Sequence, residues 1–183
     1  MPNSGNDTLW YPMRVTYNRE LKIKTALDGL QIENFLPMRY ELISSDGLPV
    51  GEPVPAIHGL IFIRSSKAEL TDLKQRNTDF EPLRFMTRPV THGLPQKEII
   101  TVTDPEMENF MRVASVTDGS VKFLENTDYV HMVGKNVRIT DGVFKGVVGV
   151  IKRIKKNRQV VVRIQGVAAV AIAYVPAVFI QEI

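Results

Sequence analysis

The sequence has no cysteine among its 183 residues, so it can form neither a disulfide framework nor a thiolate metal site. This absence fits a reducing compartment, and we expect a cytoplasmic protein. No apolar run approaches the roughly 18 residues that are needed to cross a membrane, so no membrane partner is expected. The start, MPNSGNDTLW, lacks the basic and apolar regions of a secretory signal, and we interpret it as a short lead-in without regular structure.

Residue patterns typical of catalysis and metal binding are also scarce. The three histidines, His58, His92 and His131, are far apart and have no metal-ligand spacing. The sequence has no glycine-rich phosphate loop at a helix start, no GxSxG and no paired-carboxylate signature. We therefore predict no catalytic residue, no metal and no cofactor, and we expect that the protein is not an enzyme.

The charge is divided unevenly along the chain, although the net charge is only +3. Residues 1–128 carry 14 Lys and Arg against 18 Asp and Glu, a balance of −4, while residues 129–183 carry 9 against 2, a balance of +7. Such asymmetry predicts two units with different partners. The basic end, with its cluster at residues 152–158, fits an RNA or an acidic protein surface, and it fits a solvated hairpin equally well.

Strands and helices follow one another irregularly over the first two thirds of the chain. A β-prone aromatic segment at residues 9–15 predicts the first strand, in which Pro12 argues for an edge position or an irregular start. Further extended segments are expected at residues 32–43, 56–63, 80–87 and 121–124, with a polar turn at 44–53. Helices are expected at residues 19–30, 66–75 and 104–114. This order predicts an α+β fold with an antiparallel sheet flanked by helices.

Local signals mark the start of each helix. Asn18 is the candidate N-cap of the first helix, and Ser66 with Glu69 forms a capping box at the second. The third helix begins at Asp104, with Pro105 at its first helical position. The buried stripes expected from the spacing are Ile23, Leu27 and Leu30 on the first helix and Met107, Phe110, Met111 and Ala114 on the third.

The most specific local pattern is VRITDGVFKGVVGVI at residues 137–151. Asp141-Gly142 between two β-branched runs predicts a turn, because glycine accepts a positive φ without steric cost. Gly146 and Gly149 inside the second run indicate a bend, a bulge or a close backbone approach. Strands are expected near residues 136–140, 146–153, 159–165, 168–174 and 177–182, with a turn at 155–158. Five short strands in this span favour a small SH3-like β-barrel.

This segment resembles the KOW motif, which is found in ribosomal proteins and in the NusG family of transcription elongation factors. The residues that carry the motif are Asp141, Gly142, Phe144, Gly146 and Gly149. The motif alone does not choose between the two groups, so the N-terminal part of the chain must decide.

The N-terminal part resembles a NusG N-terminal domain. Residues 9–15, with their Trp-Tyr pair, are similar to the family's first strand, and Asn18-Arg19-Glu20 is similar to the opening of its first helix. Phe35-Leu36-Pro37-Met38 is similar to the second strand, and Asp104-Pro105-Glu106 to the acidic start of the last helix.

Residues 55–62 depart from the family pattern. They stand where the family has a Phe-Pro-Gly-Tyr segment, and Gly59 is kept, but Ile57, His58 and Leu60 replace the Phe, Pro and Tyr. Together with the Leu-Pro-Met segment, these departures favour a specialised paralogue, of the kind that acts on operons for surface polysaccharides.

The resemblance implies an N-terminal domain at residues 8–116, a linker at 117–130 and a KOW SH3-like barrel at 131–183. It implies a bacterial transcription elongation or antitermination factor that binds RNA polymerase and suppresses pausing or termination, in an operon-specific manner. The alternative is a ribosome-associated or RNA-binding KOW protein. We expect a monomer whose barrel recruits a ribosomal protein or a termination factor.

In NusG-like proteins the N-terminal domain binds the clamp helices of RNA polymerase through an apolar depression. The candidates for that contact are Ile57, Leu60, Phe62, Phe110 and Met111, and each of them also fits a place in the core. Strand alternation sets Leu60 and Phe62 on the face opposite Ile57, so we favour Leu60 and Phe62.

Operon-specific members of the family contact the exposed non-template DNA strand near the first helix. The candidates in this region are Arg14, Tyr17, Arg19 and Lys22. The basic residues fit phosphate contacts, which do not specify bases, and they also fit a solvated surface. Tyr17 fits stacking on a flipped base or a place in the core. The poor helix propensity of VVGVI and VVVRI predicts that the C-terminal domain is constitutively β.

Overall fold

A computed structural model of the chain describes residues 8–45, 48–90, 96–124, 134–154 and 157–183. In these ranges the protein is a mixed α/β structure of antiparallel sheets and three α-helices. Its internal contacts divide it into two compact units, residues 1–36 with 58–104 and residues 37–57 with 105–183. Within the described ranges, no helix has both the length and the apolar character that a membrane span requires.

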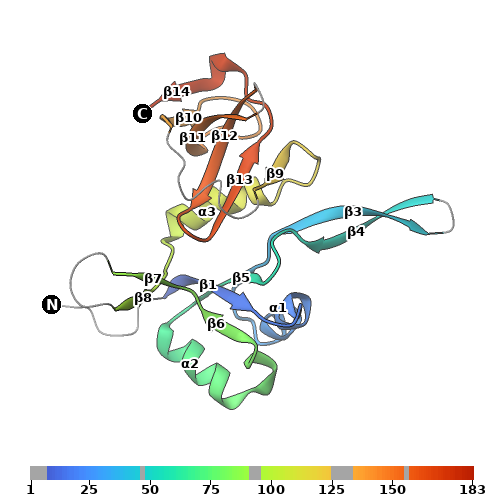
Figure 1. Cartoon of the computed structure of the whole chain (residues 1–183), viewed down its shortest axis with the longest axis vertical. Helices are drawn as coiled ribbons and strands as arrows, with labels where there is room; N and C mark the ends of the chain where they lie inside the picture. Colours follow the sequence, from blue (N-terminus) through green and yellow to red (C-terminus); the bar gives the residue numbers. More distant parts are fainter. Residues whose placement is uncertain (1–7, 46–47, 91–95, 125–133, 155–156) are drawn as a thin grey trace. The chain divides into compact units, whose positions relative to one another are not determined.

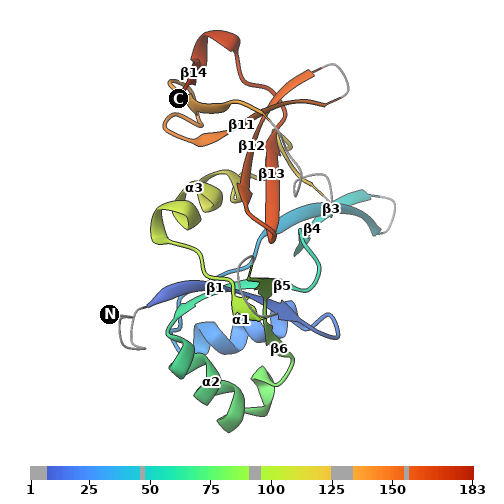
Figure 2. The ribbon, with the colours of Figure 1, turned by 60° about the vertical axis from the view of Figure 1, so that its left-hand side comes forward.

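The first unit is built on a four-stranded antiparallel sheet. In spatial order its strands are β2 (Asn34–Phe35), β5 (Leu60–Ser65), β1 (Leu9–Val15) and β6 (Leu83–Phe85). The helices α1 (Glu20–Gly29) and α2 (Lys67–Arg76) lie on the same side of this sheet in both Figure 1 and Figure 2. The unit also contains the 3-10 turn η1 (Thr78–Phe80) and a small hairpin of β7 (Thr87–Pro89) and β8 (Lys97–Ile99).

The pairing register assigns the side chains of the sheet to its two faces. Met13 of β1 lies opposite Ile61 of β5 and opposite Phe85 of β6, so these three side chains share one face. Lys74 of α2 lies over the Phe85 ring, with its Nζ 5.3 Å from the ring centroid. Therefore α2 covers the Met13 face of the sheet, and the next residues along each strand belong to the opposite face.

Pro12 lies in an interior strand, which corrects the edge position expected from the sequence. β1 pairs with β5 along most of its length but with β6 only from Met13 onward. On the same side as β6, the backbone of Trp10 exchanges hydrogen bonds with Val102. Pro12 thus occupies the gap between these two partners, where its missing N–H removes no ladder hydrogen bond.

The start and end of α1 differ from the prediction. The N-cap is Arg19, and Asn18 has a φ of +52°, so it cannot adopt the extended geometry from which a side-chain oxygen caps a helix. Ile23 and Leu27 are fully buried as expected, but Leu30 lies just beyond the helix and is 51% exposed. The predicted cap at Asn18 and the predicted burial of Leu30 are therefore wrong.

The capping box of α2 is confirmed. The Ser66 Oγ accepts a hydrogen bond from the Glu69 N–H at 3.2 Å, and the Glu69 Oε2 accepts one from the Ser66 N–H at 3.1 Å. The same carboxylate accepts a bond from the Ser65 hydroxyl at 2.8 Å. These bonds, that from Ser65 first, hold the pKa of Glu69 below its ordinary value.

The second unit contains most of α3 (Asp104–Ala114) and a six-stranded antiparallel sheet. In spatial order the strands are β14 (Ile180–Glu182), β10 (Asn136–Ile139), β11 (Val148–Ile154), β12 (Asn157–Ile164), β13 (Ala168–Ile172) and β9 (Val121–Phe123). Val161, Ala169 and Ala171 form a fully buried cluster against which Leu124 packs. No pairing joins β14 to β9 in the described part of the chain, so the predicted closed barrel stays a prediction.

The C-terminal strands otherwise match the expected segments with shifted ends: β11 ends later than expected, at Ile154, and β12 begins earlier, at Asn157. The segment predicted as a strand at residues 177–182 begins with the 3-10 turn η2 (Ala177–Phe179) before β14. The first two residues of the predicted turn at 155–158 lie outside the described residues, while Arg158 belongs to β12.

A two-stranded arm, β3 (Met38–Ser45) and β4 (Leu48–Pro55), belongs to the second unit and is visible in Figure 1. Its pairing runs from Met38 opposite Pro55 to Ser45 opposite Leu48. This corrects the polar turn expected at residues 44–53. The strand expected at 56–63 begins only at Leu60, because the residues before it form a turn.

Candidate functional site

The two favoured polymerase-docking residues lie together on one face of the sheet. Leu60 is opposite Arg14 and Phe62 is opposite Pro12, so both belong to the face that α2 does not cover. The Phe62 ring lies 6.4 Å from the ring of Phe35, measured between centroids. Leu60 is 3% exposed and Phe62 is fully buried. Docking through these two side chains therefore requires that they become accessible.

Gly59 sets the entry into this strand. Its φ is +70°, its carbonyl oxygen accepts a hydrogen bond from the Val15 N–H at 2.9 Å, and a Cβ at this position would lie 3.0 Å from the Val15 oxygen. The Gly59 N–H donates to the buried Glu20 Oε1 at 2.6 Å. These contacts give a physical reason for the glycine that the family resemblance identified.

The other three docking candidates have different environments. Ile57 lies in the turn before β5 and is half-buried, so strand alternation does not apply to it. Phe110 on α3 is fully buried, and Met111 is half-buried. Ile57 and Met111 are therefore the candidates with accessible surface. The contact of all five residues with RNA polymerase stays a prediction.

The loop between β1 and α1 presents an exposed aromatic residue. Tyr17 is 82% exposed, and the guanidinium carbon of Arg19 lies 5.8 Å from its ring centroid. Tyr17 and Asn18 both have left-handed backbone conformations, with φ of +66° and +52°. Successive non-glycine residues in this region cost of the order of 1 kcal/mol or more each, and such strain is concentrated at functional sites. The alternative that Tyr17 belongs to the core is wrong.

Arg14 and Lys22, the other predicted nucleic-acid contacts, differ in whether a carboxylate of the described residues pairs with them. Arg14 is exposed at the end of β1, while the Lys22 Nζ lies 2.9 Å from the Asp79 Oδ1. Lys22 therefore has a carboxylate partner that competes with a phosphate. Arg84 of β6 is exposed and lies opposite Arg14 in the register. No local pattern in the sequence points to Arg84, because none shows which strand pairs with β1.

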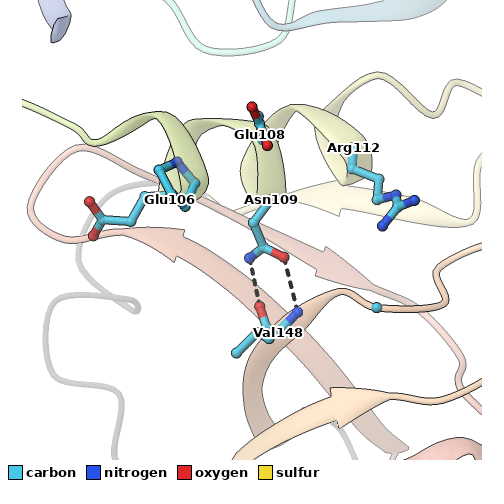
Figure 3. A pocket seen from close by; sticks show the side chains of 7 residues that line it. Glu106, Glu108, Asn109, Arg112 and Val148 are labelled. Carbon is cyan, nitrogen blue, oxygen red and sulfur yellow. Dashed lines mark hydrogen bonds between the residues drawn. The ribbon is translucent and has the colours of Figure 1, made fainter.

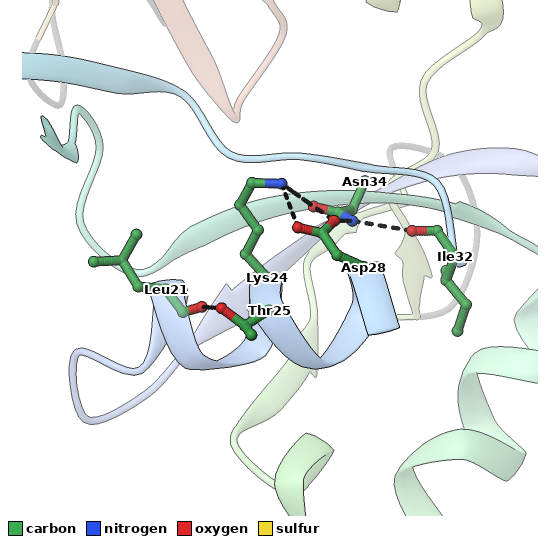
Figure 4. Close-up of polar contacts among 6 residues, drawn as sticks. All are labelled: Leu21, Lys24, Thr25, Asp28, Ile32 and Asn34. Carbon is green, nitrogen blue, oxygen red and sulfur yellow. Dashed lines mark hydrogen bonds and ion pairs between the residues drawn. The ribbon is translucent and has the colours of Figure 1, made fainter. Parts of the chain in front are cut away.

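A polar network fixes the end of α1 to β2 (Figure 4). The Asp28 Oδ1 accepts a hydrogen bond from the Asn34 Nδ2 at 2.8 Å, and the Lys24 Nζ lies 3.0 Å from the Asp28 Oδ2. The Asn34 bond and then the Lys24 bond hold the pKa of Asp28 below its ordinary value. The network orients the helix that carries Lys22.

The first residue of α3 is tied to β5. The Arg64 Nε and Nη2 donate to the two oxygens of Asp104 at 2.9 and 3.0 Å, a bidentate pair. The hydrogen bonds from Arg64 hold the pKa of the Asp104 carboxyl below its usual value. The helix start predicted at Asp104 is confirmed, and this ion pair gives it a defined position in the first unit.

A pocket in the second unit lies between α3 and the start of β11 (Figure 3). The Asn109 side chain makes two hydrogen bonds with the backbone of one residue: its Nδ2 donates to the Val148 C=O at 2.8 Å, and its Oδ1 accepts from the Val148 N–H at 2.9 Å. β12 pairs with β11 only from Val150 onward. The amide of Asn109 therefore takes the place that a neighbouring strand would occupy.

The glycines of the predicted KOW segment each have a structural reason. Gly142 has a φ of +82° in the turn after β10, and Gly146 has a φ of +87°. The Arg112 Nη1 donates to the Lys145 C=O at 3.0 Å and would lie 3.2 Å from a Cβ at Gly146. At Gly149 a Cβ would lie 2.7 Å from the Val161 oxygen, so the predicted close backbone approach is confirmed.

In the described residues, no group of three or more His, Asp or Glu side chains could hold a metal ion. His58 is exposed in the turn before β5, while His92 and His131 lie outside the described residues.

Comparison with known protein families defines the class. The family model for NusG, described as transcription termination factor nusG, matches residues 8–111. This range covers more than half of the 183 residues, from β1 into α3, and includes the sheet and the β1–α1 loop. The match indicates a transcription factor. The chain belongs to the NusG family, whose members generally bind RNA polymerase. No curated protein sequence matches the chain.

Proposed function

We propose that this protein is a non-enzymatic bacterial elongation and antitermination factor that binds the clamp helices of RNA polymerase. It suppresses pausing or termination at particular operons, as a specialised member of its family. The observation that carries the proposal is the family match over residues 8–111. The departures from the Phe-Pro-Gly-Tyr pattern at residues 57–60 support the specialised role.

The residues proposed to dock are Leu60 and Phe62, on the sheet face that α2 does not cover, together with Ile57 in the turn before β5 and Phe110 and Met111 on α3. An apolar face on a rigid sheet suits a contact with a helical pair, because such interfaces have a buried apolar centre and a polar rim. Glu20 supports this surface by holding the backbone of Gly59 at the entry to β5.

Binding of the full chain to purified core RNA polymerase tests the surface. Ile57→Asp places a charge in the half-buried turn directly before β5 and leaves the buried Leu60 and Phe62 in place. It should weaken binding at least about tenfold, which corresponds to about 1.4 kcal/mol. Leu30→Asp is the matched control, because Leu30 is 51% exposed and lies just beyond α1. Unchanged affinity for Ile57→Asp would refute this docking surface, and no binding of the wild type would refute the function.

The exposed loop of Tyr17 and Arg19 is proposed to contact the non-template DNA strand. A base stacked on an aromatic side chain contributes roughly 1–3 kcal/mol, so Tyr17→Ala should weaken binding of single-stranded DNA about five- to 150-fold. Tyr174→Ala is the matched control, since Tyr174 is 76% exposed and belongs to the second unit. Equal effects of the two variants would show that Tyr17 has no special role.

The C-terminal strands are proposed to form a KOW SH3-like barrel over residues 131–183. The proposed linker to a domain at 8–116 is residues 117–130, which include β9 of the same sheet. The turn at Gly142 and the close approach at Gly149 support this fold. Its proposed partner is a ribosomal protein or a termination factor.

The balance of +7 in residues 129–183 favours one second candidate, a ribosome-associated RNA-binding protein. The two functions give different results in one pair of measurements. Binding of ribosomal RNA with a steep salt dependence, together with no affinity for the polymerase, would select the second candidate.

A further inference from the structure

The arm formed by β3 and β4 has two outer edges whose backbone groups can be assigned. Beyond the ladder of the arm, the Ala56 N–H donates to the Pro37 C=O at 2.8 Å. This pair continues the register of the arm, so the even-numbered residues of β4 point their N–H groups toward β3. The odd-numbered residues of β4 and the even-numbered residues of β3 consequently point their N–H groups outward.

The outer edge of β4 is closed to further strand pairing. Its outward positions are Pro49, Gly51, Pro53 and Pro55. Proline has no N–H, so three of these four positions cannot donate a hydrogen bond to an added strand. Prolines on an edge strand protect it in this way, and their outward placement also explains why they do not interrupt the arm.

The outer edge of β3 is open. Its outward positions are Met38, Tyr40, Leu42 and Ser44, each of which has a backbone N–H and C=O. Among the residues that the structure describes, β3 pairs with β4 alone, and Figure 2 shows the two strands as a ribbon of their own. Tyr40, within this edge, is 57% exposed. An open edge of this kind is a template for an additional antiparallel strand.

We propose that the added strand is β3 of a second copy of this chain, paired antiparallel about Tyr40. The outward N–H groups fall on even-numbered residues, so the two Tyr40 residues can form a hydrogen-bonded pair across the two-fold axis. In this register Arg39 of each copy lies opposite Glu41 of the other. The closer, non-hydrogen-bonded positions of a ladder bring such side chains within reach of each other.

The charges select this register over its neighbours. Pairing centred on Arg39 would set two guanidinium groups opposite each other, and pairing centred on Glu41 would set two carboxylates opposite each other, which destabilises a ladder. Within one chain the Arg39 side chain already forms an ion pair with Glu41. Glu41 also lies opposite Glu52 in the arm, a like-charge pair that a second arginine would relieve.

The proline edge limits the assembly to two copies. A dimer through β3 has the order β4-β3-β3-β4, and both of its outer edges are the proline-bearing strands. The pairing surface is one short strand from each copy, far below a standard interface, so the dimer is weak and reversible. The monomer expected from the sequence is then the dilute form of the protein.

Sedimentation of the full chain over about 10 μM to 1 mM tests the proposal. The wild-type mass should rise from 20.6 kDa toward twice that value as the concentration increases. Tyr40→Pro removes one outward N–H of β3 and should keep the protein monomeric. Gly51→Pro makes the same change on the edge that is already closed and should dimerise as the wild type does. Circular dichroism checks that both variants fold.

A charge exchange identifies the register. Arg39→Glu gives a strand with two carboxylates, and Glu41→Arg gives a strand with two guanidinium groups, so each variant alone should fail to dimerise. An equal mixture of the two variants restores both opposite-charge pairs and should dimerise at the same concentrations. This result is not expected from a general loss of folding.

Three outcomes would overturn the proposal. They are a wild-type chain that stays at 20.6 kDa throughout the range, a Tyr40→Pro variant that still dimerises, and a mixture of charge variants that stays monomeric. If Tyr40→Pro lost polymerase binding while the wild type never dimerised, the open edge would belong to a strand of another protein, and self-pairing would be refuted.

Discussion

Removal of the Asn109 amide should loosen the attachment of α3 to the C-terminal sheet. In Asn109→Ala the Val148 N–H and C=O both lose their partner, with bond lengths of 2.9 and 2.8 Å in the wild type. Each neutral hydrogen bond contributes roughly 0.5–1.5 kcal/mol, so the loss is about 1–3 kcal/mol. Alanine is the better helix former by about 0.6 kcal/mol. The expected net destabilisation is therefore about 0.5–2.5 kcal/mol.

Amide hydrogen exchange at Val148 reports this change directly. In the wild type the Val148 N–H is held by Asn109, since β12 pairs with β11 only from Val150 onward. Exchange at Val148 should become faster in Asn109→Ala, by about tenfold for each 1.4 kcal/mol of lost local stability. Asn109→Asp should also make exchange at Val148 faster than in the wild type. It keeps an acceptor for the Val148 N–H, but it places a charge beside the Val148 carbonyl oxygen.

Glu108→Ala is the matched control for this series. Glu108 is the neighbouring exposed residue on α3 and lines the same pocket. Its replacement should leave the exchange rate of Val148 unchanged. The reasoning is refuted if Asn109→Ala leaves this rate unchanged and makes the protein more stable, as helix propensity alone would predict.

Three other changes should have defined effects. Gly149→Ala should lower the Tm, because the new carbon would lie 2.7 Å from the Val161 oxygen and overpacking costs roughly 1–3 kcal/mol; Gly29→Ala, with no atom within 4 Å, should not. Ser66→Ala should lower the free energy of unfolding, measured in urea, by about 1 kcal/mol, because the capping box is lost. An unchanged free energy would show that the capping box does not stabilise the fold. Because the pKa of Asp104 is lowered in the folded protein, its ion pair with Arg64 stabilises the fold at pH values above the ordinary pKa of about 3.9. This stabilisation is lost as the pH falls from there through the lowered pKa. Asp104→Asn should therefore lose less stability than the wild type on acidification, and parallel profiles would contradict this.

Local chemical signals predicted helix starts well where the deciding residues are close in sequence. The capping box of Ser66 and Glu69 needs contacts across three residues only, and the structure contains both of its hydrogen bonds. Asn18 is the counterexample. It has a capping side chain, but the turn of the chain between β1 and α1 puts Tyr17 and Asn18 in left-handed conformations, and a cap is then geometrically impossible.

Residues 32–43, which contain most of β3, are extended as expected, but the prolines and glycines at 44–53 predict a turn where the structure has the end of β3 and most of β4. Pro49, Pro53 and Pro55 are separated by even intervals, and this spacing places every missing N–H on the same edge. The even spacing of the prolines is visible in the sequence. The pairing of β3 with β4, which turns these positions to the outer edge, is not. A strand on the outside of a two-stranded arm tolerates prolines that a central strand would not.

In the candidate sites, too, features set by neighbouring residues could be predicted from the sequence, whereas contacts between residues far apart in the chain could not. Strand alternation correctly set Leu60 and Phe62 on one face. It could not show that this face is buried, nor that Asn109 contacts Val148, because these depend on residues far apart in the chain. Arg84 was missed for the same reason, since its place beside Arg14 follows from pairing between β1 and β6.

The most direct test of the central claim uses a reconstituted elongation complex of bacterial RNA polymerase, a DNA scaffold and nascent RNA. The full chain should co-elute with this complex on size exclusion and shorten the dwell time at a pause site on the scaffold. A chain that elutes separately at micromolar concentration and leaves the dwell time unchanged would contradict the account.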